Sequence, residues 1–200
     1  MEQNYKVTIM NNITTNKKNY KSYSISNSSI FDVIEKRVRG DHSGATVFVP
    51  HVCNNIDLFG AGFAAQIADR YPSVKTDYHL LGKGFLQKNM GYAQVIKVFE
   101  EAKYKHKLYI VNMIAQNGVI GPNNARPLNY FGLVKAMSSV AQYIANNTGF
   151  FNKTENVEIH CPKFGSGLAG GNWDFISDLI EDIWGKQKVF VYANKNDKKR

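Results

Sequence analysis

Two glycine-rich loops, each placed between a predicted strand and a helical pattern, constrain most strongly what this chain can fold into. The first loop lies at residues 60–62 after the continuous apolar run 46–53, and the second at residues 165–171 after the predicted strand 157–164. Short continuous apolar runs are typical of strands buried in a parallel sheet. In such a sheet both loops emerge at the carboxyl ends of strands, where α/β folds bind their ligands.

The remaining pattern continues this alternation of strands and helices. Residues 92–99 and 107–115 are expected to form an antiparallel hairpin, and residues 188–193 a closing strand. The expected helices cover residues 29–39, 63–71, 127–147 and 172–184, with Pro72 ending the second and Asn172 capping the last. The longest of them should bury Leu128, Phe131, Val134, Met137, Val140 and Ile144. The pattern predicts a layered α/β fold with a mostly parallel sheet and one hairpin.

Length and composition favour one domain over residues 1–200. At about 100–200 residues per domain the length fits one unit, and 44% apolar residues suffice for a core. The recognisable core spans residues 46–193. Residues 1–45 are polar and weakly periodic, with a candidate strand at 5–10, and residues 194–200 form a basic tail.

The sequence carries no membrane or secretion signal. No apolar run approaches the roughly 18–20 residues of a membrane helix, and the first residues contain no apolar signal-peptide core. Cys53 and Cys161 are not paired in a CxxC motif, which favours a reducing compartment. We therefore expect the cytoplasm, or the host cytoplasm for a viral protein, and no membrane partner.

The net charge of +9 lies mostly at the two ends of the chain. Residues 1–45 and the tail 195–200 each carry a surplus of three positive charges, which is typical of solvated segments. Lysine outnumbers arginine 20 to 5, and arginine is the residue that reads base edges. We do not expect nucleic acid as a partner, and a nucleic-acid-binding module would rest on the charged ends alone.

The two glycine loops have the chemistry of a phosphate site. Glycine allows backbone N–H groups to approach an anion closely, and the N-terminus of the following helix favours negative charge. Two such loops side by side would suit a diphosphate, whereas two ordinary tight turns are the structural alternative. Neither loop has the Gly-Lys-Ser/Thr of a Walker A motif or the spacing of a dinucleotide fingerprint.

Four segments in order, at residues 51–63, 115–118, 127–130 and 165–173, resemble a macro domain. The resemblance covers residues 46–193 and is closest to the branch of small stand-alone ADP-ribose-1''-phosphate phosphatases and ADP-ribosyl-ester hydrolases. It implies a three-layer α/β/α fold with a mixed, mostly parallel central sheet and flanking helices. It also implies binding of ADP-ribose or a close derivative, without a cofactor.

The resemblance assigns ligand contacts by position. The diphosphate would lie between the glycine loops, and Asn54 and Asn55 would face the distal ribose. The implied ligand-binding residues are Asn54, Asn55, Gly60, Ala61, Gly62, Phe63, Gln116, Gly165, Ser166, Gly167, Leu168 and Ala169.

The chain departs from the family pattern in three places. The Gly-Asp-Ile/Leu segment whose Asp reaches the adenine amine is absent from the first 45 residues, and residues 26–30 occupy its expected place. One hydrolase branch carries a catalytic Asp where this chain has Ala64. Another uses a lysine nucleophile where it has Ala115 and Gln116. Neither of those de-ADP-ribosylating mechanisms is therefore expected.

His51 and Asp57 are the candidate catalytic residues. A phosphatase of this branch carries a histidine at the position of His51, and histidine is suited to general acid–base catalysis near pH 7. Asp57 would orient His51 or activate a water. The structural alternatives are a histidine satisfied at the edge of the core and a turn-forming aspartate.

Two functions remain open at this point. The leading one is hydrolysis of the terminal phosphate of ADP-ribose-1''-phosphate. The alternative is a non-catalytic binder that sequesters or senses an ADP-ribose-derived signalling nucleotide, as a viral counter-defence protein would. No metal is expected, because no His lies at metal-ligand spacing from Asp or Glu. Cys53, His160 and Cys161 are assigned to the core, and His79 and His106 to the exposed surface.

Overall fold

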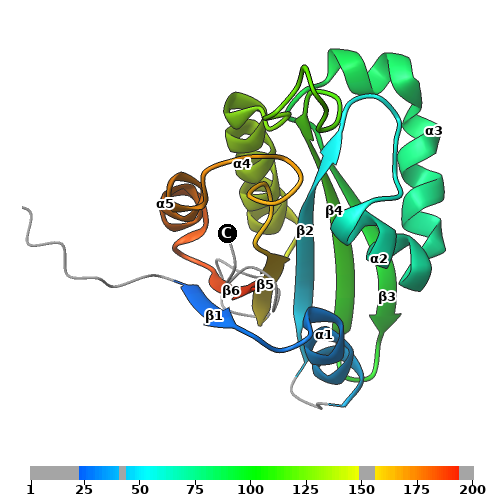
Figure 1. The fold of residues 1–200 in the computed structure, drawn as a ribbon. Helices are drawn as coiled ribbons and strands as arrows, with labels where there is room; N and C mark the ends of the chain where they lie inside the picture. Colours follow the sequence, from blue (N-terminus) through cyan, green and yellow to red (C-terminus); the bar gives the residue numbers. More distant parts are fainter. Residues whose placement is uncertain (1–22, 41–43, 149–155, 194–200) are drawn as a thin grey trace, which may run out of the picture.

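The fold is built on one six-stranded sheet, seen in a computed structural model that describes residues 23–40, 44–148 and 156–193 (Figure 1). The strand order is β1-β6-β5-β2-β4-β3. The first five strands in that order run parallel, and β3 is antiparallel to β4. The strands are β1 Tyr23–Ser26, β2 Thr46–Asn54, β3 Ala93–Glu101, β4 His106–Gln116, β5 Val157–Pro162 and β6 Lys188–Tyr192.

Helices cover both faces of this sheet, so the molecule has the expected three-layer α/β/α architecture (Figure 1). The helices are α1 Ile30–Arg39, α2 Gly62–Arg70, α3 Pro72–Lys88, α4 Tyr130–Asn147 and α5 Trp173–Trp184. Helices α4 and α5 share one hydrophobic cluster with the sheet, and α1, α2 and α3 share the other. No helix in the described ranges is both long enough and apolar enough to cross a membrane.

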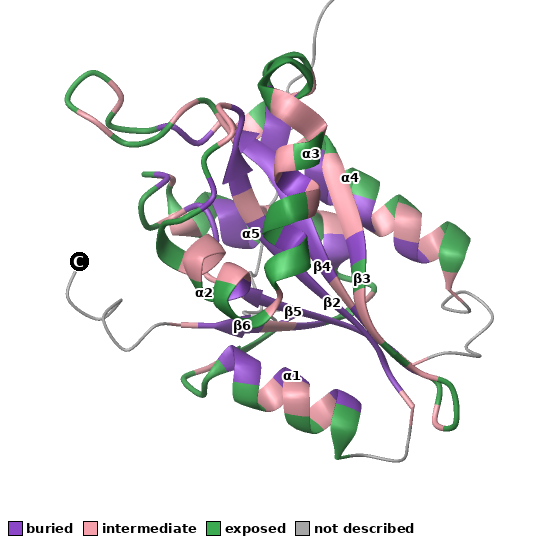
Figure 2. Cartoon of the chain, turned by 90° about the vertical axis from the view of Figure 1, so that its right-hand side faces the viewer, coloured by how far each residue is buried: buried purple, intermediate pink, exposed green. Residues whose placement is uncertain are grey.

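The two clusters follow from the alternation of side chains along the central strands. On β2, Val47 and Val49 belong to the cluster of α1–α3, while Phe48 between them belongs to that of α4 and α5. Successive residues of a strand face opposite sides, so a strand covered on both sides must be apolar throughout. The central strands are accordingly buried, and the helices turn their exposed residues outward (Figure 2).

The hairpin of β3 and β4 is as the sequence predicted, and so is the order of strands and helices after residue 46, apart from the additional helix α3. β1 is an addition, because its four residues are too short to show a period. The candidate strand at residues 5–10 and the basic tail lie outside the described residues.

Pro72 has a second role besides the expected one of ending a helix. Pro72 follows the end of α2, but it is also the first residue of α3, a position that suits its fixed φ and missing N–H. The sequence analysis did not predict α3. Its apolar residues are diluted by polar ones, and Gly82 has non-helical backbone angles (φ 74°, ψ 151°) that break its period.

The long helix α4 begins later than predicted. Asn129, rather than a residue near Pro127, caps it by accepting a hydrogen bond from the Gly132 N–H. The buried residues of α4 include Leu133, Ala136, Met137, Val140 and Ile144. Phe131, expected in the core, is 74% exposed, because at roughly 3.6 residues per turn it lies about 200° round the helix from the buried Leu133.

Candidate ligand cleft

A large cleft lies along the edge of the sheet where the parallel strands end. It encloses about 1280 Å³, above the roughly 300–1,000 Å³ of an ordinary small-molecule pocket. β2 leads into α2 on one face of the sheet, and its neighbour β5 leads into α5 on the other. The chain thus leaves these two neighbouring strands towards opposite faces of the sheet, and the cleft opens between the two connections. Open α/β sheets bind their ligands in such a crevice.

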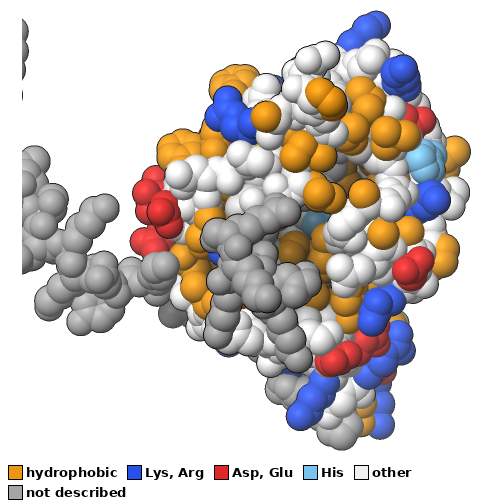
Figure 3. Space-filling view, in the orientation of Figure 1, with side chains coloured by type: hydrophobic (Ala, Val, Ile, Leu, Met, Phe, Trp, Pro, Cys, Tyr) orange, Lys and Arg blue, Asp and Glu red, His pale blue; other side chains and the backbone are white. Residues whose placement is uncertain are grey.

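The cleft is long. Its lining runs from residues 27–32 after β1 to Gln116 at the end of β4 and to Val119 and Ile120 beyond it. Five neighbouring strands span about 19 Å, at about 4.8 Å per gap. Hydrophobic side chains gather on the face seen in Figure 3, and the acidic and basic ones lie towards its margins. Such a groove suits an extended ligand with more than one ring.

The N-terminus of α2 opens at the middle of this cleft. The N-cap residue Ala61 provides no side-chain hydrogen bond, whereas Ser29 and Asn172 cap α1 and α5. The first N–H groups of a helix need partners, and the helix dipole favours a negative one. Gly60, Ala61, Gly62 and Phe63 all line the cleft, so these N–H groups lie beside it.

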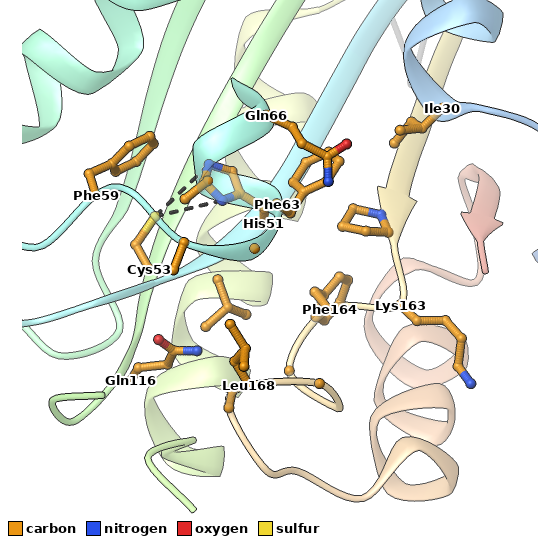
Figure 4. Close-up of a pocket in the computed structure, with 18 of the residues that line it drawn as sticks. Ile30, His51, Cys53, Phe59, Phe63, Gln66, Gln116, Lys163, Phe164 and Leu168 are labelled. Atoms are coloured by element: carbon orange, nitrogen blue, oxygen red, sulfur yellow. Dashed lines mark hydrogen bonds between the residues drawn. The ribbon is translucent and has the colours of Figure 1, made fainter. Parts of the chain in front are cut away.

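The second glycine loop faces the first across the cleft (Figure 4). Gly165 has φ +77°, a conformation that L side chains rarely adopt, so its glycine is required by the turn. A Cβ on Gly167 or Gly60 would meet no atom within 4 Å. A side chain would therefore fit at both positions within the protein itself. Glycine at these positions leaves the loop backbone open to the cleft.

Most of the residues predicted for the site do line this cleft. They are His51, Asn54, Asp57, Gly60, Ala61, Gly62, Phe63, Gln116, Gly165, Gly167, Leu168 and Ala169. Asn55 and Ser166 do not line it. Asn55 donates to Oδ1 of Asn117 and accepts from the Gly118 N–H, while the Ser166 hydroxyl donates to the Lys163 carbonyl.

The Asn54 side chain holds its own loop together. Its Oδ1 accepts hydrogen bonds from the N–H groups of Ile56 and Leu58, and its amide donates to the Leu58 carbonyl. The Tyr78 hydroxyl of α3 lies within hydrogen-bond distance of Asn54 carbonyl and Oδ1 oxygens. Asn54 therefore fixes the loop that carries Asp57.

His51 is buried beneath the cleft, with 1% of its surface exposed. Its Nε2 lies 2.7 Å from Oδ1 of Asn112, and its Nδ1 lies 3.8 Å from the Cys53 sulfur (Figure 4). Burial lowers the pKa of His51 from 6.5 to about 4, and the bond to Asn112 offsets this only in part. The imidazole is therefore neutral at pH 7, and its Nε2–H is directed to Asn112 rather than to the cleft.

Asp57 is not the partner of His51. Its Oδ1 lies 2.7 Å from Nδ1 of His79 on α3, and both side chains line the cleft. The expectation that His79 and His106 are exposed and idle was therefore wrong. His79 forms this pair, and His106 is 2% exposed and accepts the Ala45 N–H at Nδ1.

Other lining residues escaped the sequence analysis. They include Asp32 at the start of α1, Gln66 on α2, and Lys75 and His79 on α3. Lys75 and His79 are four residues apart, so they share one helix face. That spacing carries information only once residues 72–88 are recognised as a helix.

The assignment of His160 and Cys161 to the core is confirmed, since both are buried. His160 bonds to Glu158 and to the Tyr192 hydroxyl. Burial raises the pKa of the Cys53 and Cys161 thiols, so both are neutral. Within the described ranges, no group of three or more His, Cys, Asp or Glu residues is placed to hold a metal ion.

Comparison with known proteins shows what the chain is similar to. No family model matches the chain. An uncharacterized 17.5 kDa protein of Enterobacteria phage T4 is 26% identical over 144 residues, 72% of this chain and 83% of its own length. An ADP-ribose 1''-phosphate phosphatase of Lodderomyces elongisporus is 25% identical over 165 residues, 74% of this chain and 91% of its own.

The solved structures give the same fold. A macrodomain protein of Streptomyces coelicolor superimposes with a TM-score of 0.52 at 22% identity, over 74% of this chain and 97% of that one. Thermosipho africanus DarTG, determined in complex with ADP-ribose, superimposes with a TM-score of 0.53 at 15% identity, over 75% and 38%. These likenesses concern the fold of the chain. Its fold is that of a macro domain.

Proposed function

We propose that this chain binds ADP-ribose or a close derivative in the cleft, and that it hydrolyses the terminal phosphate of ADP-ribose 1''-phosphate. The observation that carries the proposal is the uncapped N-terminus of α2 facing the loop 165–169 across the cleft. The relative named as an ADP-ribose 1''-phosphate phosphatase and the ADP-ribose complex of the Thermosipho structure support the same ligand.

In this proposal the diphosphate lies between the two glycine loops. The free N–H groups at the start of α2 attract the anion from one side, and the backbone at Gly167 approaches it from the other. Lys75 and Lys163 also line the cleft and add positive charge at its edges. A dianionic ligand thus meets backbone donors at the centre and cations at the margin.

The two ends of the cleft then differ in chemistry. Residues 27–32 are polar apart from Ile30 and Phe31, and they suit the adenosine half. They occupy the place where the sequence lacks the family's adenine-binding aspartate. Asp57 follows β2, His79 lies on α3 and Gln116 ends β4. These residues line the other end of the cleft, where the distal ribose and its 1''-phosphate would lie.

A second candidate function is binding without turnover. The observation in its favour is the state of His51, which is buried and neutral and whose N–H is engaged by Asn112. A protein of this kind would sequester or sense an ADP-ribose-derived nucleotide.

Release of inorganic phosphate distinguishes the two candidates. The purified chain is incubated with ADP-ribose 1''-phosphate, and phosphate is measured over time, with ADP-ribose binding followed on the same preparation by calorimetry. Multiple turnovers support the phosphatase. Tight binding with no phosphate above the uncatalysed background supports the binder and contradicts the phosphatase.

A further inference from the structure

The Asp57–His79 pair stands at one end of the cleft and forms part of neither glycine loop. We propose that His79, oriented by Asp57, is the proton-transfer group of the cleft and acts at the phosphate end of the bound nucleotide. The inference rests on the proposed phosphatase function and deepens it, because it names the group that would protonate the leaving oxygen.

The geometry leaves one nitrogen of His79 free. Its Nδ1 lies 2.7 Å from Oδ1 of Asp57, and no residue in the described part of the chain is bonded to its Nε2. A carboxylate on one ring nitrogen fixes the tautomer, so the other nitrogen is the one presented to a reactant. The side chain of His79 is 38% exposed and that of Asp57 29%, so both are accessible from the cleft.

Asp57 is held in an uncommon conformation. Its φ is +65°, in the left-handed region that Asp and Asn tolerate better than other non-glycine residues. The Asn54 amide fixes the turn around it, and the Tyr78 hydroxyl ties that turn to α3. Tyr78 is the residue directly before His79, so the contact that holds the loop also sets the pair. Unusual backbone conformations of this kind concentrate at functional sites.

The comparison with His51 favours His79. Both histidines line the cleft, but His51 is 1% exposed and bonded to Asn112. A proton-transfer group must come within hydrogen-bond reach of the atom it serves. His79 has a free nitrogen at the cleft surface, whereas that of His51 lies against Cys53.

The neighbourhood of His79 suits a phosphate ester. Lys75 lies four residues earlier on α3 and also lines the cleft, so a cation and the imidazole share one helix face. Gln116, the last residue of β4, lines the same end. A phosphate held there would meet a positive charge, and its ester oxygen would lie near an imidazole.

The step balances with water as the only co-reactant. The oxygen of water bonds to phosphorus, and the bond between phosphorus and the ribose oxygen breaks with its electron pair on that oxygen. Protonated His79 gives its Nε2 proton to the ribose oxygen, which becomes the hydroxyl of ADP-ribose. The attacking water keeps one proton as the hydroxyl of inorganic phosphate and returns the other to His79.

Two substitutions test the pair against a matched control. His79→Gln removes the proton-transfer group, and Asp57→Asn removes the charge while keeping a residue that tolerates the same φ. Asp69→Asn makes the same carboxylate-to-amide change at an exposed residue of α2 that does not line the cleft. Thermal unfolding of each variant checks that it folds.

We expect His79→Gln to lower kcat by about 10²–10⁴-fold, the usual contribution of general acid–base catalysis, with KM changed less than about threefold. Asp57→Asn should lower kcat by at least about tenfold, because the imidazole loses its orienting carboxylate. Asp69→Asn should match the wild type. A wild-type kcat in folded His79→Gln overturns the pair's role and leaves the phosphatase standing, whereas no phosphate release by the wild type overturns both.

A second measurement, which does not depend on turnover, tests whether His79 lies beside the bound ligand. The ¹⁵N resonances of the His79 ring are followed by NMR while ADP-ribose is added. We expect them to shift as the cleft fills and to report a protonated Nδ1 in the free protein, with that tautomer lost in Asp57→Asn. Ring resonances unmoved at saturating ADP-ribose would overturn the proposal, because His79 would then lie away from the ligand.

Discussion

Nε2 of His51 on β2 lies 2.7 Å from Oδ1 of Asn112 on β4. The amide of Asn112 in turn donates to Oε1 of Gln94 on β3, so a chain of three side chains crosses three adjacent strands. His51 and Asn112 are both buried, and an unpaired polar group there would cost about 1–3 kcal/mol. This row of hydrogen-bonded side chains therefore holds His51 in the sheet in its neutral form.

The pKa of His51 makes stability fall in acid. Burial lowers this pKa from 6.5 to about 4, so between these values the unfolded chain binds a proton that the folded chain does not. The contribution of His51 is intact above about pH 6.5 and is lost as the pH falls towards 4. At about 1.4 kcal/mol per pKa unit, the loss amounts to about 3 kcal/mol.

Urea unfolding at a series of pH values between 7 and 4 measures this loss in the wild type and in His51→Gln. The variant should be less stable at pH 7 but should show a shallower decline in acid. Equal declines in the two proteins would show that His51 titrates normally.

The loop at residues 165–171 contains two kinds of glycine: those that its turns require, and Gly167, beside which there is open space. Gly170 has φ +68°, and a Cβ there would lie 2.6 Å from the Ala125 carbonyl oxygen. Gly170→Ala should therefore lower the free energy of unfolding by about 1–3 kcal/mol. Gly167→Ala should change it by less than about 0.5 kcal/mol, because the added methyl group meets no atom. Paired denaturant titrations make the comparison, and equal losses would contradict the assigned roles.

Glu158 forms a partly buried ion pair with Arg37 at 3.1 Å and bonds to His160, and together these lower its pKa to about 2 although burial alone would raise it. Arg37→Met removes one partner of this carboxylate and should cost about 1–3 kcal/mol at pH 7. The double variant Arg37→Met/Glu158→Gln should recover part of the loss. Thermal unfolding of the three proteins tests this, and a double variant less stable than Arg37→Met would contradict the explanation.

The central strands were predictable mainly from their apolar residues. β2 carries a nearly continuous apolar run, the signal that marks a central parallel strand, whereas Glu158 and His160 interrupt that signal in the equally buried β5. The cap Asn172 was equally predictable, since it begins α5 by a local hydrogen bond that depends on nearby residues alone. β1 and α3 were missed because one is very short and the other is interrupted at Gly82.

The two glycine loops of the site could be predicted from the sequence, but the hydrogen-bond partners of its side chains could not. Glycines at fixed offsets mark Gly60 and Gly167 from sequence alone, whereas the partner of Asp57 depends on how α3 docks beside the loop. That docking is a tertiary contact through Tyr78, which leaves no local pattern. The sequence therefore named the carboxylate of the pair and missed its histidine.

Calorimetric titration with ADP-ribose of the wild type, Gly167→Glu and Gly84→Glu tests the central claim most directly. Both glycines face open space, but Gly167 lines the cleft and Gly84 lies on α3 outside its lining. We predict a wild-type dissociation constant on the order of 1 μM, about −8 kcal/mol, and the same value in Gly84→Glu. Gly167→Glu should bind at least about 100-fold more weakly, because like charges about 4 Å apart repel by about 4 kcal/mol near a protein surface. Wild-type affinity in folded Gly167→Glu would contradict the placement of the diphosphate between the two glycine loops.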